Sequence, residues 1–386
     1  MIPFSGKTGH HPKTCCQRGK KMASRPLKGA VIGYGFISSK GHIPAYLERA
    51  KKQQDVEIVA IADICEERRV IAGDCVPGAR IYTDYEILLE QESEELDFVD
   101  ISTPPVFHTE IALAAFKKGL HVLCEKPLTT RLEDAKKLLQ AAQKYQRVLY
   151  PCHNYKHAPV VKAIREVIES GNIGKIRSVT LNTFRNTHAK GVNEWKTHWR
   201  REMKYSGGGI AMDHGSHTFY LTFDWLSGYP TAVTAKMSNL EPDKWDTEDN
   251  FSAVLTFPNG LAHVCLTWTA GVRKVIYTVQ GERGAITVDD DEMQIATMQK
   301  TSGPDVAQGA VTWSVEKKNI KSDWMDASHV QWFNSLFDGF KKAIDQGDFV
   351  GKEAKEAYLC IQLINQAYES AKEKSKELPL QSEVSF

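Results

Sequence analysis

Between residues 29 and 38 the chain reads Gly29-Ala-Val-Ile-Gly33-Tyr-Gly35-Phe-Ile-Ser38. The apolar run predicts a short buried strand, and the glycines that follow predict a tight turn into a helix. The second glycine lets a pyrophosphate approach the backbone at the helix N-terminus. Ser38 replaces a third glycine, which is a mild departure because that position needs only a small side chain. We therefore expect a dinucleotide-binding loop that includes Gly33, Gly35, Phe36 and Ile37.

Asp63 ends the next expected strand, residues 56–63. Its carboxylate can accept hydrogen bonds from both hydroxyls of the adenosine ribose and would repel a 2′-phosphate. The sequence therefore favours NAD over NADP as the cofactor. Arg68 and Arg69 lie too far along the chain to decide this choice, but they keep NADP open. The alternative is a glycine turn that binds no nucleotide, and the surrounding strand, helix and acidic residue disfavour it.

Up to about residue 150, expected strands alternate with expected helices. Apolar runs at 98–102, 121–124 and 148–152 predict three more strands, and residues 109–118 and 132–145 predict two intervening helices. Right-handed crossovers between such strands produce a parallel sheet. We therefore expect residues 27–150 to form an α/β Rossmann-type domain with a doubly wound parallel sheet.

Beyond residue 150 the pattern changes, because most of the expected strands follow one another through turns. These strands are expected at 176–184, 231–237, 251–257, 262–268, 275–280 and 285–288, and helices at 160–170, 328–346 and 352–374. The pattern predicts an α+β domain over residues 151–386 with an open, largely antiparallel sheet. We interpret residues 1–26 as a disordered extension or as the product of a start codon placed too early, since Met22 stands shortly before the first strand.

Composition excludes several classes of protein. The 386 residues allow two to three domains. With 49 basic and 48 acidic residues, the net charge of +1 gives no electrostatic reason to expect a nucleic acid or an anionic membrane as partner. No apolar run approaches the ~20 residues of a membrane-spanning helix. The eight cysteines lack a repeated metal spacing, so we expect reduced thiols in a cytoplasmic protein and no metal site.

Three further motifs point to a known family. They are Thr103-Pro-Pro-Val-Phe-His108 followed by Glu125-Lys126-Pro127, the turn Gly171-Asn-Ile-Gly174, and Gly207-Gly-Gly-Ile-Ala-Met-Asp213-His-Gly-Ser-His217. Over residues 28–380 the chain resembles the Gfo/Idh/MocA oxidoreductases, named for glucose-fructose oxidoreductase and inositol dehydrogenase. The resemblance implies NAD(P)-dependent chemistry on sugars, cyclitols or similar polyols, and a second domain whose open sheet is often an oligomer interface. It also implies a set of further cofactor contacts: Ser102, Thr103, Pro104, His108, Glu125 and Lys126.

Lys126 is the first candidate catalytic residue. Pro127 stops the strand just beyond it, which aims the ammonium out of the carboxyl edge of the sheet, where ligands of such sheets bind. A lysine there can donate to a substrate hydroxyl or carbonyl oxygen, and Glu125 can orient it or help to hold the nicotinamide ribose. The alternative is a solvated pair of charges at a strand end, which the family pattern disfavours.

Asp213 and His217 are the other catalytic candidates. They are four residues apart, so on a helix, as the family implies, they share one face. Histidine suits acid–base work on an alcohol because it titrates near neutrality, and a carboxylate one turn away can orient its ring and bind the substrate. The sequence leaves open whether Lys126 or His217 is the base. We interpret His214, which is offset on the helix, as local structure.

Three more residues are candidates for substrate binding. Lys156 is the closest match to an arginine that often faces the substrate in relatives. Trp199 and Arg200 lie in a polar and aromatic segment, residues 185–206, and suit the C–H faces and hydroxyls of a sugar. The alternative is that the tryptophans of this segment only pack it onto the sheet.

Together these residues favour an oxidoreductase that transfers a hydride between nicotinamide and a secondary alcohol or ketone of a sugar, sugar derivative or cyclitol. One alternative is an NAD-dependent glycosidase, which oxidises its sugar transiently and recycles a bound cofactor. Another is a ligand-sensing regulator without catalysis, which the complete set of Lys126, Asp213 and His217 disfavours. We expect a homodimer or homotetramer through the sheet of the second domain, with no nucleic-acid or membrane partner.

Overall fold

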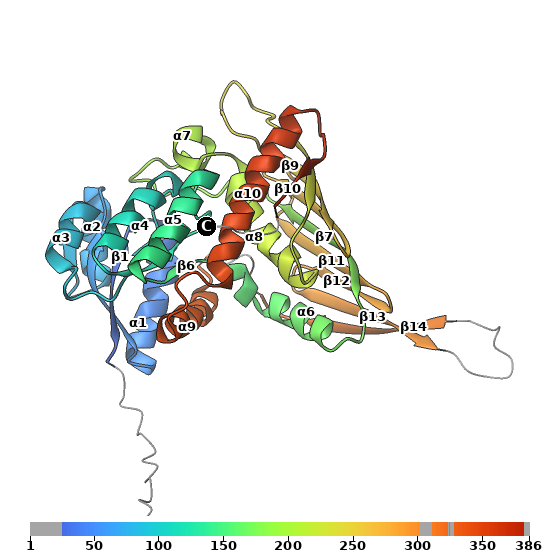
Figure 1. The fold of residues 1–386 in the computed structure, drawn as a ribbon, viewed down its shortest axis with the longest axis horizontal. Helices are drawn as coiled ribbons and strands as arrows, with labels where there is room; N and C mark the ends of the chain where they lie inside the picture. The colour runs from blue at the N-terminus through green and yellow to red at the C-terminus, as the bar shows by residue number, and fades with distance from the viewer. Residues whose placement is uncertain (1–24, 301–310, 323, 325–327, 382–386) are drawn as a thin grey trace, which may run out of the picture.

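A computed structural model describes residues 25–300, 311–322, 324 and 328–381 of the chain, without the side chain of Lys300. Most of the segment expected to be a disordered extension, and residues 301–310, lie outside these ranges. The described residues form two sheets with helices between and around them (Figure 1). None of the helices in these ranges is long and apolar enough to cross a membrane.

The first sheet has six parallel strands in the order β3-β2-β1-β4-β5-β6. Their bounds are β1 Leu27–Ile32, β2 Val56–Ala62, β3 Arg80–Tyr82, β4 Phe98–Ile101, β5 His121–Cys124 and β6 Leu149–Pro151. The order is that of a Rossmann fold, so the predicted doubly wound sheet is confirmed. Strand β4 is buried along its whole length because helices cover both faces of the sheet.

Five helices of the first part connect these strands. They are α1 Ile43–Lys52, α2 Glu66–Cys75, α3 Tyr85–Glu92, α4 His108–Lys117 and α5 Leu132–Tyr145. Apolar side chains of α3, α4 and α5 pack into the larger core of the molecule, whereas those of α1 and α2 pack into a second cluster on the other face of the sheet. A short π-helix, η1 (Ser38–His42), precedes α1 and gives the turn after β1 an extra residue.

The second sheet has nine strands in the order β14-β13-β12-β11-β7-β10-β9-β8-β15. Their bounds are β7 Ile176–Phe184, β8 Ala232–Ser238, β9 Asn250–Phe257, β10 Gly260–Thr267, β11 Lys274–Gly281, β12 Gly284–Asp289, β13 Glu292–Lys300, β14 Val311–Asn319 and β15 Leu378–Pro379. Among the described strands of this second sheet, only the pair of β7 and β10 is parallel, which confirms the prediction of an open, largely antiparallel sheet.

Three helices lie on one side of the second sheet: α6 Pro159–Glu169, α8 Ile210–Trp225 and α10 Lys352–Lys372 (Figure 1). Helix α8 is buried on nearly all sides because it lies between the sheet and α10. This placement brings the N-terminal turns of α8 toward the carboxyl edge of the first sheet.

Helix α9 (Val330–Gln346) crosses back to the first sheet. Its buried face, with Leu336, Phe337 and Phe340, packs into the cluster that contains Phe98 of β4. Arg49 of α1 also donates to the backbone oxygen of Asn334, at 3.0 Å. The domain boundary near residue 150 stays a prediction. In space, α9 packs with the first sheet although it follows that boundary in the chain.

Candidate active site

One cavity of about 780 Å³ lies where the first sheet meets the second part of the chain. Its lining comes from residues that directly follow β1, β2, β4 and β5, from the N-terminal turns of α8, and from the segment after β7. The carboxyl edge of a parallel sheet is the usual place for a ligand in this fold. We call the part around Gly33, Gly35 and Asp63 the glycine-loop end, and the part around Lys126, Asp213 and His217 the α8 end.

The glycine loop is shaped by backbone that only glycine tolerates well. Gly33 has φ +92°, and a Cβ atom there would lie 2.9 Å from the backbone oxygen of Ser102. Gly35 lines the cavity, and a Cβ atom there would meet no protein atom within 4 Å, so it would project into open space. The hydroxyl of Ser38 donates to the backbone oxygen of Gly33 at 2.5 Å, which ties the loop to the helix that follows.

Asp63 is fixed by its own surroundings. Its two oxygens accept from the backbone N–H groups of Tyr34, at 2.6 Å, and Cys65, at 2.8 Å. Burial raises the pKa of Asp63, although these two hydrogen bonds oppose the rise. Arg68 donates to the backbone oxygen of Tyr34 and Arg69 to that of Asp63, so both guanidinium groups are engaged at this end.

A dinucleotide fits this end of the cavity. Thr103 lines the cavity, and its hydroxyl oxygen is buried without a hydrogen-bond partner among the described residues. An orphaned buried hydroxyl of this kind calls for a ligand atom. The other predicted cofactor residues that line the cavity are Gly33, Gly35, Phe36, Ile37, Asp63, Ser102, Pro104, Glu125 and Lys126.

His108 does not line the cavity, in contrast to the prediction that it contacts the cofactor. It is fully buried, with Nε2 at 2.8 Å from the backbone oxygen of Thr103 and Nδ1 at 3.1 Å from that of Pro127. Burial lowers the pKa of His108, although the contacts with backbone oxygens oppose the fall. Through these contacts, His108 holds the segment after Lys126 against the loop after β4, and so supports the wall of the cavity from behind.

A buried polar group beneath Glu125 was missed by the sequence interpretation. His42 of η1 places Nδ1 at 2.6 Å from a carboxylate oxygen of Asp100 and Nε2 at 3.1 Å from one of Glu125. Burial alone would lower the pKa of His42, but the two carboxylates outweigh it and raise that pKa to about 10. The charged ring therefore fixes Glu125, whose other oxygen accepts from the backbone N–H of Lys126 at 2.9 Å.

At the α8 end, Lys126 and Asp213 are in contact. The ammonium of Lys126 donates to the backbone oxygen of Asp213 at 2.9 Å and lies 3.4 Å from its carboxylate. Arg200 donates to the same carboxylate oxygen at 3.2 Å. Burial alone would raise the pKa of Asp213, yet Lys126 and Arg200 hold it well below its ordinary value. Asp213 is therefore an ionised group between two cations.

His217 lies one turn further along α8 and also lines the cavity. Its Nδ1 is 2.8 Å from the hydroxyl of Tyr220, and its ring stacks on that of Tyr155 with centroids 3.9 Å apart. Burial, and then the charge of Lys126, hold the pKa of His217 well below its ordinary value. The imidazole is therefore neutral at physiological pH.

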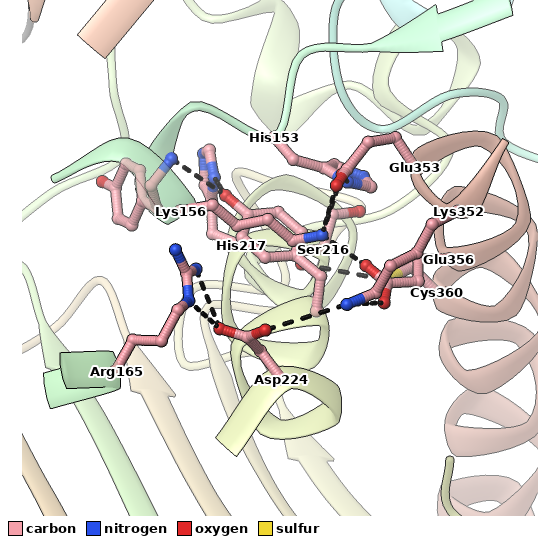
Figure 2. A network of polar contacts seen from close by, with 12 residues as sticks. His153, Lys156, Arg165, Ser216, His217, Asp224, Lys352, Glu353, Glu356 and Cys360 are labelled. Carbon is pink, nitrogen blue, oxygen red and sulfur yellow. Dashed lines mark hydrogen bonds and ion pairs between the residues drawn. The ribbon is translucent and has the colours of Figure 1, made fainter. Parts of the chain in front are cut away.

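Lys156 is the second predicted residue that the structure does not place at the cavity. Its ammonium is buried between the carboxylates of Glu353, at 2.8 Å, and Glu356, both on α10 (Figure 2). His153 joins the cluster, with Nδ1 at 2.7 Å from Glu353. The sequence could not reveal these two glutamates as partners, because they lie some two hundred residues further along the chain. We therefore withdraw Lys156 from the substrate-binding residues.

The segment after β7 closes the cavity from the second part of the chain. Trp199 and Arg200 line the cavity as predicted sugar contacts should, and the guanidinium lies 4.2 Å from the centre of the indole ring. We call residues 186–197 the strap, because Glu194 reaches Arg68 at the opposite end, with 3.5 Å between charged atoms. Arg200, shortly after the strap, contacts Asp213 at the α8 end, so the segment after β7 as a whole touches both ends of the cavity.

Several lining residues were not predicted. Asn154 lines the cavity directly before Tyr155, and its side-chain oxygen is buried without a partner among the described residues. His214 lines the cavity as well, with Nδ1 at 3.2 Å from the carboxylate of Asp213. No sequence motif marks either residue as part of a site. They lie at the same cavity because the fold brings η3 (Asn154–His157) and α8 together.

Comparison with known proteins agrees with this architecture. Residues 27–153 match the oxidoreductase family with an NAD-binding Rossmann fold, and residues 161–287 match the GFO/IDH/MocA C-terminal domain. Among similar structures, levoglucosan dehydrogenase in complex with NADH and L-sorbose has a TM-score of 0.76 at 22% identity, covering 92% of this chain and 99% of that one. At this identity the likeness shows a shared fold.

Several curated relatives have named activities. D-Glucoside 3-dehydrogenase of Escherichia coli is 26% identical over 254 residues, which cover 62% of this chain and 69% of that protein. Levoglucosan dehydrogenase of Pseudarthrobacter phenanthrenivorans is 28% identical over 239 residues, which cover 53% of this chain and 59% of that protein. With both domains matched in order, the chain belongs to the Gfo/Idh/MocA family of NAD-binding oxidoreductases.

Proposed function

We propose that this protein is an NAD-dependent oxidoreductase that transfers a hydride between the nicotinamide and a secondary alcohol or ketone of a sugar, sugar derivative or cyclitol. One observation carries the proposal. A single cavity has a dinucleotide loop with Asp63 at one end, and Lys126, Asp213 and His217 at the other. Both ends belong to the same cavity, so a cofactor and a small polyol can lie next to each other in it.

Each residue of the α8 end has a defined part in the proposed reaction. Bound NAD would supply the acceptor for the hydride. Lys126 reaches the substrate oxygen from the end of β5 and can move a proton at Nζ. Asp213 stays ionised and accepts hydrogen bonds from a neighbouring hydroxyl, while His217 presents its free ring nitrogen to the substrate. Trp199 offers an aromatic face to the C–H groups of a sugar ring.

The class of substrate rests on two supports. The relatives described above are named for a D-glucoside and for levoglucosan, which are carbohydrates. The cavity adds hydrogen-bonding groups of both kinds, with Asn154 and Asp213 as acceptors and Arg200 as a donor. Such a set suits a molecule whose hydroxyls both donate and accept. Cyclitols such as inositol share that chemistry and belong to the same proposed class.

The test is direct. Purified protein is incubated with NAD or NADP and a panel of pyranoses, anhydrosugars, glycosides and inositols, and NAD(P)H is followed by its absorbance. We expect net NADH from at least one free sugar or cyclitol, with NAD preferred because of Asp63. Release of an aglycone without net NADH would contradict the proposal. If that release also stopped when the bound cofactor was stripped, the result would support the glycosidase alternative.

We further propose that copies of the chain associate through the second sheet as a homodimer or homotetramer in the cytoplasm. Helices α6, α8 and α10 lie on one side of this sheet (Figure 1), and no described helix covers its other side. Exposed residues on that side include Leu261 and His263 of β10. Light scattering on the purified protein tests this, since a monomer would contradict it.

The six described cysteines are free thiols, in line with a reducing compartment.

A further inference from the structure

Tyr220 contacts His217 from within the same helix. Its hydroxyl oxygen lies 2.8 Å from Nδ1 of His217 and accepts from the backbone N–H of Tyr155 at 3.2 Å. The side chain of Tyr220 is fully buried. Since His217 lines the cavity, Nε2 is the ring nitrogen through which it can meet a ligand.

The position of one hydrogen atom follows from these contacts. A phenol has one hydrogen to donate and lone pairs to accept with. The N–H of Tyr155 occupies a lone pair of Tyr220, so the phenol hydrogen needs an acceptor. Among the described residues, the acceptor in hydrogen-bond contact with this hydroxyl is Nδ1 of His217. The opposite tautomer, with hydrogen on Nδ1, would leave the buried phenol hydrogen unpaired.

Both groups keep the charge state that this requires. Burial raises the pKa of Tyr220 well above its ordinary value, so the phenol stays protonated. Burial and the charge of Lys126 lower the pKa of His217, so the imidazole stays neutral. A neutral imidazole that accepts at Nδ1 carries its hydrogen on Nε2.

We propose that Tyr220 is a positioning residue that fixes the tautomer of His217, so that His217 presents a hydrogen-bond donor to the substrate oxygen and is not the base. This inference rests on the proposed function for its substrate. It assigns the proton transfer to Lys126. In the reductive direction, the substrate carbonyl carbon would gain a hydride from NADH, which would be oxidised to NAD. The Nζ–H bond of Lys126 breaks and an O–H bond forms on the substrate, while His217 keeps its hydrogen. Oxidation runs the same steps in reverse.

The cluster around Lys156 explains why Tyr220 stays in place. The ring of His153 lies against that of Tyr220, with centroids 4.3 Å apart, and the ammonium of Lys156 lies 5.5 Å from the centre of the tyrosine ring. Lys156 is itself held by Glu353 and Glu356, as Figure 2 shows together with His153 and His217. The cluster thus restrains the ring that orients His217, although it does not touch the cavity.

The first test reads the tautomer directly. The ¹⁵N-labelled imidazole of His217 is observed by NMR in the full-length protein without cofactor, and is assigned by its absence in His217→Gln. We expect the wild type to carry hydrogen on Nε2, and Tyr220→Phe to lose this preference. Tyr358→Phe, which removes a phenol hydroxyl from α10, should leave the His217 signals unchanged. Hydrogen on Nδ1 in the wild type, or an unchanged tautomer in Tyr220→Phe, would overturn the proposal.

The second test separates a donor from a base. The amide nitrogen of glutamine can take the place of Nε2 as a donor, but glutamine cannot accept a proton. We expect His217→Gln to retain activity within about tenfold, whereas loss of a base costs at least ~10²-fold. Tyr220→Phe should lower kcat about tenfold with KM and NAD affinity nearly unchanged. A loss of 10²-fold or more in His217→Gln, with the fold intact by circular dichroism, would refute the donor role. If no sugar is turned over, the proposed function fails, and the NMR result still decides the role of Tyr220.

Discussion

The glycine-loop end and the α8 end of the cavity differ in what holds their polar groups. At the glycine-loop end, Asp63 is fixed by two backbone N–H groups, and the loop itself is shaped by the backbone of Gly33. At the α8 end, Asp213 is fixed by the side chains of Lys126 and Arg200. Backbone N–H groups hold Asp63 whatever side chains Tyr34 and Cys65 carry, whereas the contacts of Asp213 depend on which side chains stand at positions 126 and 200.

This difference predicts that single substitutions separate the two ends. A change at the α8 end should affect chemistry while leaving NAD binding intact, and a change at the glycine-loop end should do the reverse. Residues that support one end from behind should change the stability of the fold, and residues of the strap should have small effects.

Lys126→Ala should have the largest effect on turnover. It removes the group that moves the proton and one of the two cations beside Asp213. We expect kcat to fall about 10³-fold, within the range for a lost acid–base group, and the dissociation constant for NAD to rise far less, since Lys126 is one of many predicted cofactor contacts. Steady-state kinetics and calorimetric titration with NAD measure the two values. Lys137→Ala, an exposed lysine on α5, is the control. If turnover stayed within threefold of wild type, the assignment of Lys126 would be wrong.

Glu356→Gln should have the largest effect on stability. The carboxylate is almost completely buried against Lys156, and its loss leaves the buried ammonium with Glu353 as its remaining carboxylate partner. We expect the free energy of unfolding to fall by about 2 kcal/mol in urea denaturation, as for a lost hydrogen bond to a charged group. Glu369→Gln on the same helix breaks an exposed pair with Lys372, and it should cost below about 0.5 kcal/mol. Equal effects of the two variants would show that the buried cluster does not stabilise the α8 end.

The same cluster gives the stability a pH dependence. Burial alone would raise the pKa of Glu353, but Lys156 and His153 lower it far below its ordinary value. A carboxyl whose pKa is depressed by folding stabilises the protein fully above its unfolded pKa of about 4.3 and loses that contribution as the pH falls below it. The melting temperature of the wild type should therefore decrease from pH 5 to pH 3 more steeply than that of Glu353→Gln. Parallel decreases in the two proteins would contradict this origin.

Asp63→Ala tests the glycine-loop end. Loss of the carboxylate removes the acceptor for the ribose hydroxyls and the repulsion of a 2′-phosphate. We expect NAD to bind about tenfold more weakly, as befits one or two charge-assisted hydrogen bonds, and NADP to bind more tightly than to the wild type. Titration of both cofactors measures this, with kcat at saturating NAD nearly unchanged. A wild type that prefers NADP would refute the ribose argument before the variant is made.

The sequence was informative where structure depends on neighbours along the chain. Five of the six parallel strands, the glycine loop and Asp63 were predicted from local runs and turns, and the family motifs led to Lys126, Asp213 and His217. Strand β3 was not predicted, because it has only three residues, none of them fully buried, and so leaves no apolar run in the sequence. Lys156 and His108 are not among the residues that line the cavity: both are buried, Lys156 against Glu356 and His108 against the backbone of Thr103 and Pro127. His42 was missed because its partners, Asp100 and Glu125, lie far along the chain. Tyr220 was missed although His217 is only three residues away, because a tyrosine on a helix carries no sign of which neighbour its hydroxyl contacts.

The strap is the remaining link between the two ends, and Glu194→Gln should give the smallest effect. Its carboxylate lies 3.5 Å from the guanidinium of Arg68, and it is partly exposed, so the ion pair is worth little and is screened by salt. We expect the rate of NAD dissociation from Glu194→Gln to be about threefold higher than from the wild type at low salt. At high salt the difference should vanish, because screening weakens the ion pair between Glu194 and Arg68 in the wild type as well. Stopped-flow fluorescence measures that rate. Glu202→Gln, which breaks an exposed pair with Lys204, controls for a general change of charge. An effect of Glu194→Gln that does not depend on salt would contradict the ion-pair explanation. The strap would then restrain the cofactor by packing, through Trp195 and its neighbours in the cavity lining.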